Sequence, residues 1–217
     1  MNSSTDAVEI DVLISRLHEA HPGARYELDW ETPEQLLVAT ILAAQCTDER
    51  VNRVTKELFV TYPDAAAFAA AEREELELAI KATGFFRQKA KTVQRVCQAL
   101  VEHHGGEVPR SMKAMVGLPG IGRKSANVVL NTAFDMATGI IVDTHVGRVA
   151  PRMGLSTAKK ADRIERDLMA LVPESEWTFF GPAMVLFGRY TCTARAPKCE
   201  ACVMADACPK VGVEGSR

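Results

Sequence analysis

The chain has 217 residues, in which 26 Lys and Arg oppose 28 Asp and Glu to give a formal net charge of −2. Hydrophobic residues make up 47% and charged residues 25%, which is typical of a folded protein and excludes a disordered, collagenous or fibrous chain. The near-neutral charge also counts against a nucleic-acid partner, unless the basic residues gather in one stripe.

The length allows one large domain or two small lobes. No apolar run approaches the roughly 20 residues that span a bilayer, and residues 1–6 lack the features of a secretion signal. We therefore expect a cytoplasmic protein. A reducing compartment makes metal ligation a better explanation of clustered cysteines than disulfide bonds.

The apolar residues follow a helical period almost throughout, so the sequence predicts an all-α fold. Residues 32–35 have the capping-box spacing with proline at the first helical position, and they predict a helix that carries the apolar segment 36–44. Thr47 or Asp48 caps the next helix, which stops before Tyr62-Pro63. Further helices are predicted over about 87–104, up to Gly105-Gly106, and after Ser111, Gly122, Thr157 and Glu174.

The charged residues are unevenly spread along the chain. Residues 1–60 contain 11 acids and 5 bases, a balance of −6, whereas residues 61–217 contain 17 acids and 21 bases, a balance of +4. Within residues 61–217, two groups of basic residues contain no acid: Arg87, Lys89, Lys91 and Arg95, and Arg110, Lys113, Arg123 and Lys124. Groups of this kind are commonly solvated helix faces, but here both adjoin glycine-marked turns, which favours phosphate contact.

Four cysteines gather near the C-terminus, at Cys192, Cys199, Cys202 and Cys208. Clustered thiolates select zinc or an iron-sulfur cluster. Zinc usually takes two tight pairs of ligands, whereas this run has one tight pair and wider loops, which suit a 4Fe-4S cluster. Zinc remains the alternative. The isolated Cys46 and Cys97 are expected to be small buried hydrophobic residues.

Residues 118–122, Leu-Pro-Gly-Ile-Gly, predict a tight turn between two helices, with glycines that permit a close backbone approach. The following helix starts with outward-pointing N–H groups, which suit a nucleic-acid phosphate, although an ordinary interhelical turn is the alternative. Lys124 lies in the first turn of this helix beside Arg123. Lysine acts as a nucleophile where neighbouring cations favour its neutral amine, but most lone lysines are surface residues.

A further segment, residues 140–148, runs from three apolar residues into Asp143, where aspartate usually caps a helix. With these features in this order, the chain resembles the endonuclease III family of DNA glycosylases, within the helix-hairpin-helix superfamily. The resemblance rests on residues 118–129, on residues 142–146 and on the four-cysteine spacing, which is that of the family's 4Fe-4S loop. It covers most of the chain and implies that Lys124 and Asp143 are catalytic.

The resemblance implies a bifunctional enzyme that removes oxidised pyrimidines, such as thymine glycol, from duplex DNA and then nicks the strand. The damaged nucleotide must leave the stack, because its C1′ is otherwise out of reach. Lys124 would attack C1′, displace the base and form a Schiff base, and β-elimination would break the strand 3′ to the abasic site. Asp143 would assist at the sugar or at the lysine. Similar mismatch-specific adenine glycosylases lack this lysine, which favours the lyase-competent branch.

Further DNA contacts are implied by two loops that resemble those of the family. Gln45, within residues 42–48, would fill the gap left by the extruded base, and Phe85 or Phe86 would act as a wedge between bases. A plain interhelical connection and core packing are the respective alternatives. The other implied DNA contacts are Arg87, Gly120, Gly122, Arg123, Arg195 and Lys198.

The implied fold has two helical lobes with a DNA-binding cleft between them. Residues 26–136 form a six-helix lobe with the hairpin. Residues 1–25 and 137–217 form a second lobe with the cluster loop, the segment 192–208 that carries the four cysteines. Lys124 and Asp143 would face each other across the cleft of a monomer that acts at the bacterial nucleoid. A non-enzymatic DNA-binding module and a ferredoxin-like electron carrier remain as alternatives.

The basic groups also give an expectation about affinity. A lysine or arginine that contacts a phosphate contributes to affinity and to its salt dependence. Changes to alanine are expected to weaken DNA binding at Arg87, Lys89, Lys113 and Lys198, but not at Arg16 or Arg25.

Overall fold

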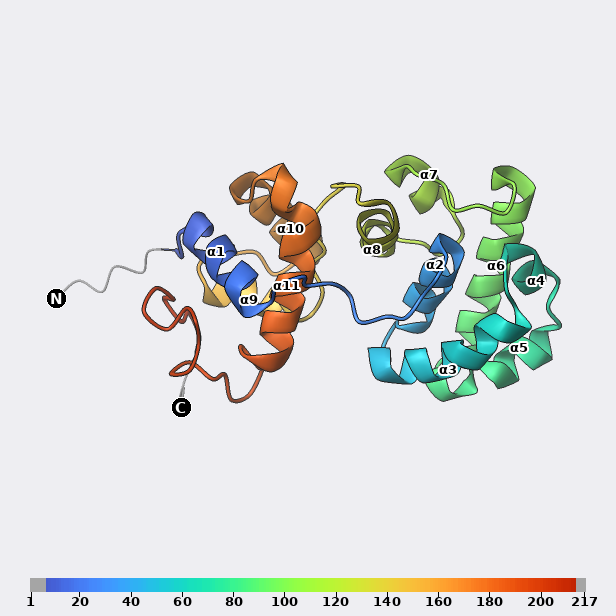
Figure 1. The fold of residues 1–217 in the computed structure, drawn as a ribbon, viewed down its shortest axis with the longest axis horizontal. Helices are drawn as coiled ribbons and strands as arrows, with labels where there is room; N and C mark the ends of the chain where they lie inside the picture. Colours follow the sequence, from blue (N-terminus) through green and yellow to red (C-terminus); the bar gives the residue numbers. More distant parts are fainter. Residues whose placement is uncertain (1–6, 214–217) are drawn as a thin grey trace. The chain divides into compact units, whose positions relative to one another are not determined.

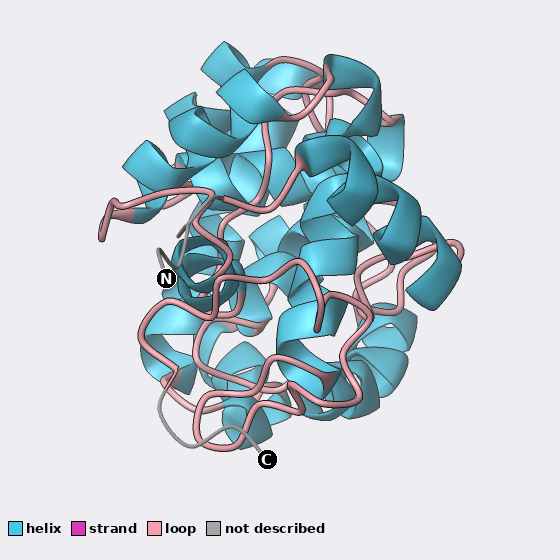
Figure 2. Ribbon diagram, turned by 90° about the vertical axis from the view of Figure 1, so that its left-hand side faces the viewer, coloured by secondary structure: helices cyan, strands magenta, loops and turns pink. Residues whose placement is uncertain are grey.

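A computed structural model describes residues 7–213, which contain eleven α-helices and two short 3-10 helices (Figure 1). These residues contain no β-strand, as Figure 2 shows, so the predicted all-α fold is confirmed. No helix within 7–213 combines the length and the apolar character that crossing a membrane requires.

The chain divides into two compact units. One comprises Met1–Tyr26 and Ala137–Arg217, of which residues 7–26 and 137–213 are described, and the other comprises Glu27–Met136. The helices of the first unit are α1 (Ile10–Ala20), α9 (Val146–Arg152), α10 (Ala161–Leu171), the 3-10 helix η2 (Glu174–Glu176) and α11 (Trp177–Tyr190). Those of the second are α2 (Pro33–Leu42), α3 (Asp48–Thr61), α4 (Ala65–Ala70), α5 (Arg73–Ala79), η1 (Lys81–Thr83), α6 (Phe86–His104), α7 (Met112–Gly117) and α8 (Arg123–Phe134).

The helix starts follow the capping residues of the sequence. Thr32 Oγ1 accepts a hydrogen bond from the Gln35 N–H at 3.3 Å, and Gln35 Oε1 accepts one from the Glu31 N–H at 2.8 Å. Thr47 caps α3 by accepting from the Arg50 N–H at 3.4 Å. These side chains bond N–H groups that a helix's first turn leaves without an intrahelical acceptor, so both predicted starts are confirmed.

The sequence does not predict helix α5, and for helix α9 it gives only the capping signal of Asp143. Helix α5 is short, and its N-cap residue Glu72 makes no side-chain capping bond. Helix α9 contains Gly147 and Pro151, both of which disfavour helix interiors. It forms because Val146 and Val149 are fully buried in the core of their unit, and this packing outweighs the local propensity.

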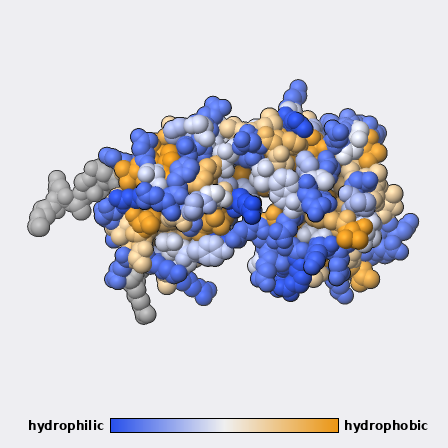
Figure 3. All heavy atoms as spheres, in the orientation of Figure 1, coloured by the Kyte–Doolittle hydropathy of each residue, from blue (hydrophilic) through white to orange (hydrophobic). Residues whose placement is uncertain are grey.

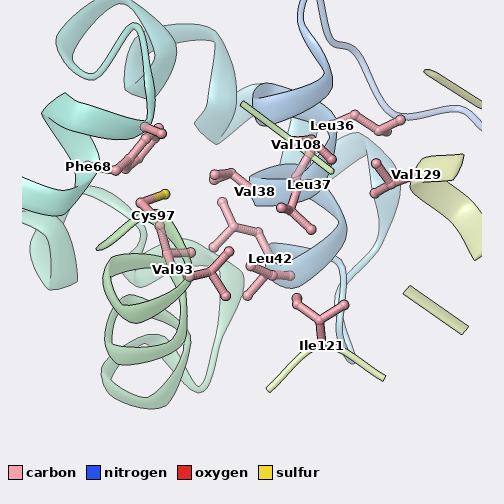
Figure 4. Packing of buried hydrophobic residues seen from close by; sticks show 14 of the residues in the cluster. Leu36, Leu37, Val38, Leu42, Phe68, Val93, Cys97, Val108, Ile121 and Val129 are labelled. Carbon is pink, nitrogen blue, oxygen red and sulfur yellow. The ribbon is translucent and has the colours of Figure 1, made fainter. Parts of the chain in front are cut away.

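The core of the unit Glu27–Met136 is built around α2 and α6. Figure 4 shows side chains from these helices and their neighbours pointing toward one another, Leu37, Leu42 and Val93 among them, and all three are fully buried. Ile121 extends into this core from the turn between α7 and α8 (Figure 4). Burying a side chain of this size contributes about 1.5–3 kcal/mol, so Ile121 anchors that turn.

Cysteines outside the C-terminal group are packed against this core. Cys97 is buried, and burial raises the pKa of its thiol to about 12, so the predicted hydrophobic role is confirmed. Cys46 is half-buried against the same core. Burial in an apolar setting makes the Cys97 thiol unreactive.

Hydrophilic side chains cover most of the face shown in Figure 3, with apolar ones scattered between them. The most exposed large apolar residues among residues 7–213 are Val60, Leu78 and Phe85, at 82%, 70% and 66%. Single exposed apolar residues are common on protein surfaces, so exposure alone gives none of them a function.

Candidate functional site

The turn between α7 and α8 separates its apolar residues from its glycines. Leu118 and Ile121 are buried, and the Ile121 N–H donates to the Leu118 carbonyl at 3.1 Å, which closes the turn. Gly120 has a φ of 81°, a left-handed conformation that favours glycine, and it is exposed with Gly122. The apolar residues therefore anchor the turn in the core, and the backbone of the two glycines lies at the surface.

Gly120 and Gly122 differ in whether the fold requires glycine at that position. A Cβ at Gly120 would lie 3.1 Å from Thr92 Cγ2, in addition to the left-handed φ. Gly122 has φ −91° and ψ 170°, which any residue adopts, and a Cβ there would meet nothing within 4 Å. The fold of this chain therefore requires glycine at 120 but not at 122, where the free space is open to a molecule from outside.

Lys124 is exposed in the first turn of α8, directly after Arg123. Gly122 supplies no side-chain cap to this helix, and the first-turn N–H groups of a helix have no intrahelical acceptor. The positive end of the helix dipole and two cationic side chains thus coincide beside the glycine turn. This arrangement suits an anion such as a phosphate.

Asp143 caps α9. Its Oδ1 accepts hydrogen bonds from the His145 N–H at 2.8 Å and from the Val146 N–H at 2.9 Å. The buried Ile141 and Val142 fix the chain before it. The capping interpretation is therefore correct, and it orients the carboxylate while Oδ2 has no hydrogen-bond partner among residues 7–213.

The surroundings of Asp143 hold a buried hydroxyl group. Burial raises the pKa of Tyr26 well above its ordinary value, and the negative charge of Asp143 raises it further. The Tyr26 hydroxyl has no hydrogen-bond partner in the described chain. His145 Nδ1 lies 3.2 Å from an Arg148 Nη2.

The four C-terminal cysteines line one small pocket, together with apolar side chains such as Phe187 and Met204. None of them forms a disulfide bond. No three His, Cys, Asp or Glu side chains within residues 7–213 converge on one point as a single metal ion requires. Four thiols around one pocket, with only one tightly spaced pair among them, suit the four corners of a 4Fe-4S cluster better than one zinc ion.

The electrostatics of these thiols also fit a cluster. Burial raises the pKa of Cys202, and the nearby Cys208, Cys192 and Cys199 raise it further. Four thiolates that influence one another in this way require a compensating positive charge, which the irons of a 4Fe-4S cluster supply when bound. The residues present therefore fit the group.

Three arginines hold the cluster loop, and the sequence did not indicate their role. Arg152 Nη1 donates to Cys192 Sγ at 3.4 Å and to the Thr193 carbonyl at 2.7 Å, and Arg148 donates to the Cys192 carbonyl at 3.2 Å. Arg16 pairs with Asp206, with Nη2 at 2.9 Å from Oδ2, and lowers the pKa of that carboxyl to about 2. Arg16 is thus engaged within the loop and is unsuitable as a neutral control for DNA binding.

The two loop residues with expected roles in DNA opening share one backbone feature. Gln45 and Phe85 are exposed, with φ of 54° and 47°. Phe86 instead packs, half-buried, against the core. Arg87 is exposed, 3.9 Å from Glu77 Oε2. The structure therefore separates Phe85, which points to solvent, from Phe86, which packs inward.

The position of Lys89 differs from the one that the sequence predicts. The sequence predicts that it contacts phosphates, but it is 5% exposed, and its Nζ donates to two backbone carbonyls inside the unit. A buried ammonium cannot reach a phosphate at the surface, so that prediction is wrong. The signal lay in the helical spacing, because Lys89 shares a face with the buried Val93 and Val96. Arg195 and Lys198 are exposed on the cluster loop, as expected.

The chain is similar in sequence and in fold to known proteins of DNA repair. Residues 38–174 match the model of the HhH-GPD superfamily base excision DNA repair protein, and residues 192–208 match the iron-sulfur binding domain of endonuclease III. Endonuclease III of Synechocystis sp. is 51% identical over 94% of this chain and 91% of its own length, and that of Escherichia coli K12 is 40% identical over 90% and 92%. The structure of a non-covalent endonuclease III–DNA complex superposes with a TM-score of 0.87 at 40% identity, covering 92% of this chain and 93% of that one.

The helical fold, the glycine hairpin and the superfamily match define a DNA glycosylase of base excision repair. Within that class the chain belongs to the endonuclease III family. It is accordingly a DNA-binding enzyme, a DNA glycosylase with abasic-site lyase activity, and it carries a 4Fe-4S cluster.

Proposed function

We propose that this enzyme removes oxidised pyrimidines from duplex DNA through a Schiff base on Lys124 and cleaves the strand 3′ to the abasic site. The observation that carries this proposal is the exposed lysine in the uncapped first turn of α8, directly after the glycine hairpin. The enzyme would act as a monomer on damaged pyrimidines and abasic sites in chromosomal DNA, within the nucleoid.

The proposed chemistry begins when the neutral Lys124 amine attacks C1′ of the extruded nucleotide. The base leaves with the electron pair of its glycosidic bond and takes up a proton, and the sugar ring opens to give a protonated imine. Loss of a C2′ proton then places electrons next to C3′, and the C3′–O bond breaks with the phosphate as leaving group. Hydrolysis of the imine returns free Lys124.

Asp143 would stabilise the positive charge that develops at the sugar, or accept the proton that Lys124 must lose. Its capping bonds support this role, because they fix Oδ1 on the backbone while Oδ2 has no partner in the described chain. A carboxylate held by two backbone N–H groups has little freedom to turn, so little reorganisation is needed during the reaction.

For DNA opening, we propose Phe85 as the wedge and Gln45 as the residue that fills the vacated position. Phe85 is 66% exposed at a left-handed position, whereas Phe86 is packed, which favours Phe85. An apolar side chain that enters the stack unstacks a base step, and an amide can pair with the orphaned base.

Backbone contacts would come from the hairpin and from the cluster loop. The exposed glycines and Arg123 would hold one phosphate at the start of α8, and Arg195 and Lys198 would contact others, beside Arg87 near the wedge. The cluster ligands are proposed to be Cys192, Cys199, Cys202 and Cys208.

The open space at Gly122 gives a prediction that separates binding from folding. Serine is a good N-cap residue, so Gly122→Ser should leave the melting temperature unchanged or raise it slightly. The side chain would occupy the phosphate position, and losing one charge-assisted hydrogen bond should weaken DNA binding about tenfold. Gly120→Ala should instead lower the melting temperature by roughly 2–8 °C, because a left-handed alanine costs about 1–2 kcal/mol. Thermal unfolding and fluorescence anisotropy measure the two effects, and equal DNA affinity of Gly122→Ser and wild type would reject the contact.

The exposed cations give a second prediction, on salt dependence. Alanine at Arg87, Lys113 or Lys198 should weaken DNA binding and reduce the slope of log K against log salt by about 0.9 for each phosphate that the variant no longer neutralises. Arg25→Ala is the matched control, because Arg25 is exposed and lies in the acidic part of the chain. Binding titrations between about 50 and 200 mM salt measure the slope, and an unchanged slope in all three variants would reject the proposed path of the DNA backbone.

The proposed substrate is tested by single-turnover cleavage of duplexes that carry thymine glycol, dihydrouracil, uracil or an abasic site. Release of the two damaged pyrimidines with a 3′ β-elimination product, and no release of uracil, supports the proposal. Nicking of the abasic duplex alone would limit the enzyme to lyase chemistry. Binding without any cleavage would favour the DNA-binding module, and electron transfer without cleavage would favour the ferredoxin-like carrier.

A further inference from the structure

Lys89 has an unusual position for a lysine. It lies in the first turn of α6 but is only 5% exposed. Its Nζ donates to the Leu42 carbonyl at 2.7 Å and to the Thr83 carbonyl at 2.8 Å. One buried ammonium therefore joins two chain segments that are far apart in the sequence.

Both carbonyls end a helical segment, and each precedes one of the two loops proposed to enter DNA. Leu42 is the last residue of α2 and stands just before the Gln45 loop, and Thr83 is the last residue of η1 and stands just before Phe85. Carbonyls at a helix C-terminus lack intrahelical donors and carry partial negative charge, so an ammonium between them is favourable. Lys89 thus satisfies groups that would otherwise be buried without partners.

Both loop tips depend on support from their surroundings. Gln45 and Phe85 occupy the left-handed region, where a side chain with a Cβ is disfavoured, and only Asp135 and Lys210 share this property among the non-glycine residues of 7–213. Strained backbone persists where neighbouring structure holds it, and it is frequent at functional sites. Burial lowers the pKa of Lys89 and the adjacent Cys46 opposes that shift, so the residue after Gln45 also lies within electrostatic reach of the ammonium.

We propose that Lys89 is a positioning residue that fixes the Gln45 loop and the Phe85 loop relative to each other, so that the wedge and the gap-filling amide enter the duplex together. This inference rests on the proposed function of the two loops. Lys89 itself touches neither the substrate nor the reacting atoms, because it is buried.

The test is the variant Lys89→Met, which keeps an unbranched stem and removes the donors. Base removal from a thymine glycol duplex should fall about 10- to 100-fold, since hydrogen bonds from a charged group are lost on both loops. Borohydride trapping on single-stranded abasic DNA should stay within about 3-fold of wild type, because no base has to be extruded. The salt slope of DNA binding should not change, since Lys89 contacts no phosphate.

Lys56→Met is the matched control, an exposed lysine on helix α3 outside both basic groups, and it should leave duplex base removal within about 3-fold of wild type. Equal losses of duplex base removal and single-strand trapping in Lys89→Met would overturn the proposal, as would wild-type rates in both assays. If Lys89→Met does not fold, Lys89→Gln, which keeps two N–H donors on a shorter side chain, must show the same selective loss, and an unselective loss overturns the proposal.

The positioning role of Lys89 can be tested even if the proposed substrate is wrong. If the wild-type enzyme releases no oxidised pyrimidine, then 2-aminopurine placed next to an abasic site reports base unstacking without any chemistry. Wild type and Lys56→Met should raise its fluorescence on binding, and Lys89→Met should not. An equal rise in all three proteins would overturn the role of Lys89 whatever the substrate is.

Discussion

Replacing Lys124 with glutamine is expected to lower both base removal and strand cleavage by about 10³-fold or more, because the proposed nucleophile of both steps is lost. The fold should not change, since Lys124 is exposed and glutamine is also a good helix former. Binding to lesion DNA should weaken only slightly, by the loss of one exposed charge. Single-turnover kinetics on thymine glycol duplexes measure the first effect.

Lys113→Gln is the control for Lys124→Gln, since it removes an exposed lysine from the neighbouring helix α7. It should retain base removal within about 10-fold while binding weakens, because it removes one proposed phosphate contact and leaves the proposed nucleophile in place. A Lys124→Gln enzyme that released the damaged base at the wild-type rate but no longer nicked the strand would contradict a shared nucleophile. Water would then be the attacking group in base removal.

The second large effect is expected for Asp143→Asn, which should lower kcat by about 10²–10³-fold, because this change removes the charge that we propose stabilises the sugar in the transition state. Asparagine keeps an Oδ1 acceptor for the N–H groups of His145 and Val146, so the cap of α9 should survive. Affinity for lesion DNA should stay within about 3-fold, since the lost interaction forms only in the transition state. Rapid-quench kinetics and thermal unfolding measure both effects on one variant.

Asp143→Ala separates the capping role from the catalytic one. Alanine loses the cap as well, so the free energy of unfolding should be about 1 kcal/mol lower than for Asp143→Asn, while the kinetic losses of the two variants should be similar. Near wild-type kinetics in Asp143→Asn combined with a large loss in Asp143→Ala would assign to Asp143 a structural role alone.

The parts of the fold that depend on local signals were predictable from the sequence. Thr32 and Thr47 cap the helices that are expected to start there, and α6 ends at His104 before Gly105, whose φ is 63°. A cap joins a side chain to a backbone group three residues away, so its information is short-range. The glycine hairpin is local in the same sense.

Long-range contacts account for what the sequence did not reveal. Helix α9 is stabilised by packing against its unit, and its Arg148 and Arg152 hold a loop some forty positions further along the chain. The basic surplus of residues 61–217 therefore overstates the charge available to DNA, since these two arginines and Lys89 are engaged inside their units.

The choice between Phe85 and Phe86 and the burial of Lys89 were readable in principle. Phe86, Ala90 and Val93 recur at the spacing of one helix face, which places Phe86 inside and leaves Phe85 before the first helical residue. Lys89 lies on the same side of α6 as Val93 and Val96, all of them buried. At these positions the helical spacing predicts burial better than the residue type does.

Lys124 is proposed to form the covalent bond to the sugar, and every step of the proposed reaction depends on that bond. The most direct measurement is reduction with borohydride during turnover on a thymine glycol duplex, followed by digestion and mass spectrometry of the cross-linked peptide. We expect an adduct on Lys124, with the mass of the reduced sugar attached to Nζ. An adduct on any other amine, or base release and nicking by wild type without any adduct, would contradict this proposal.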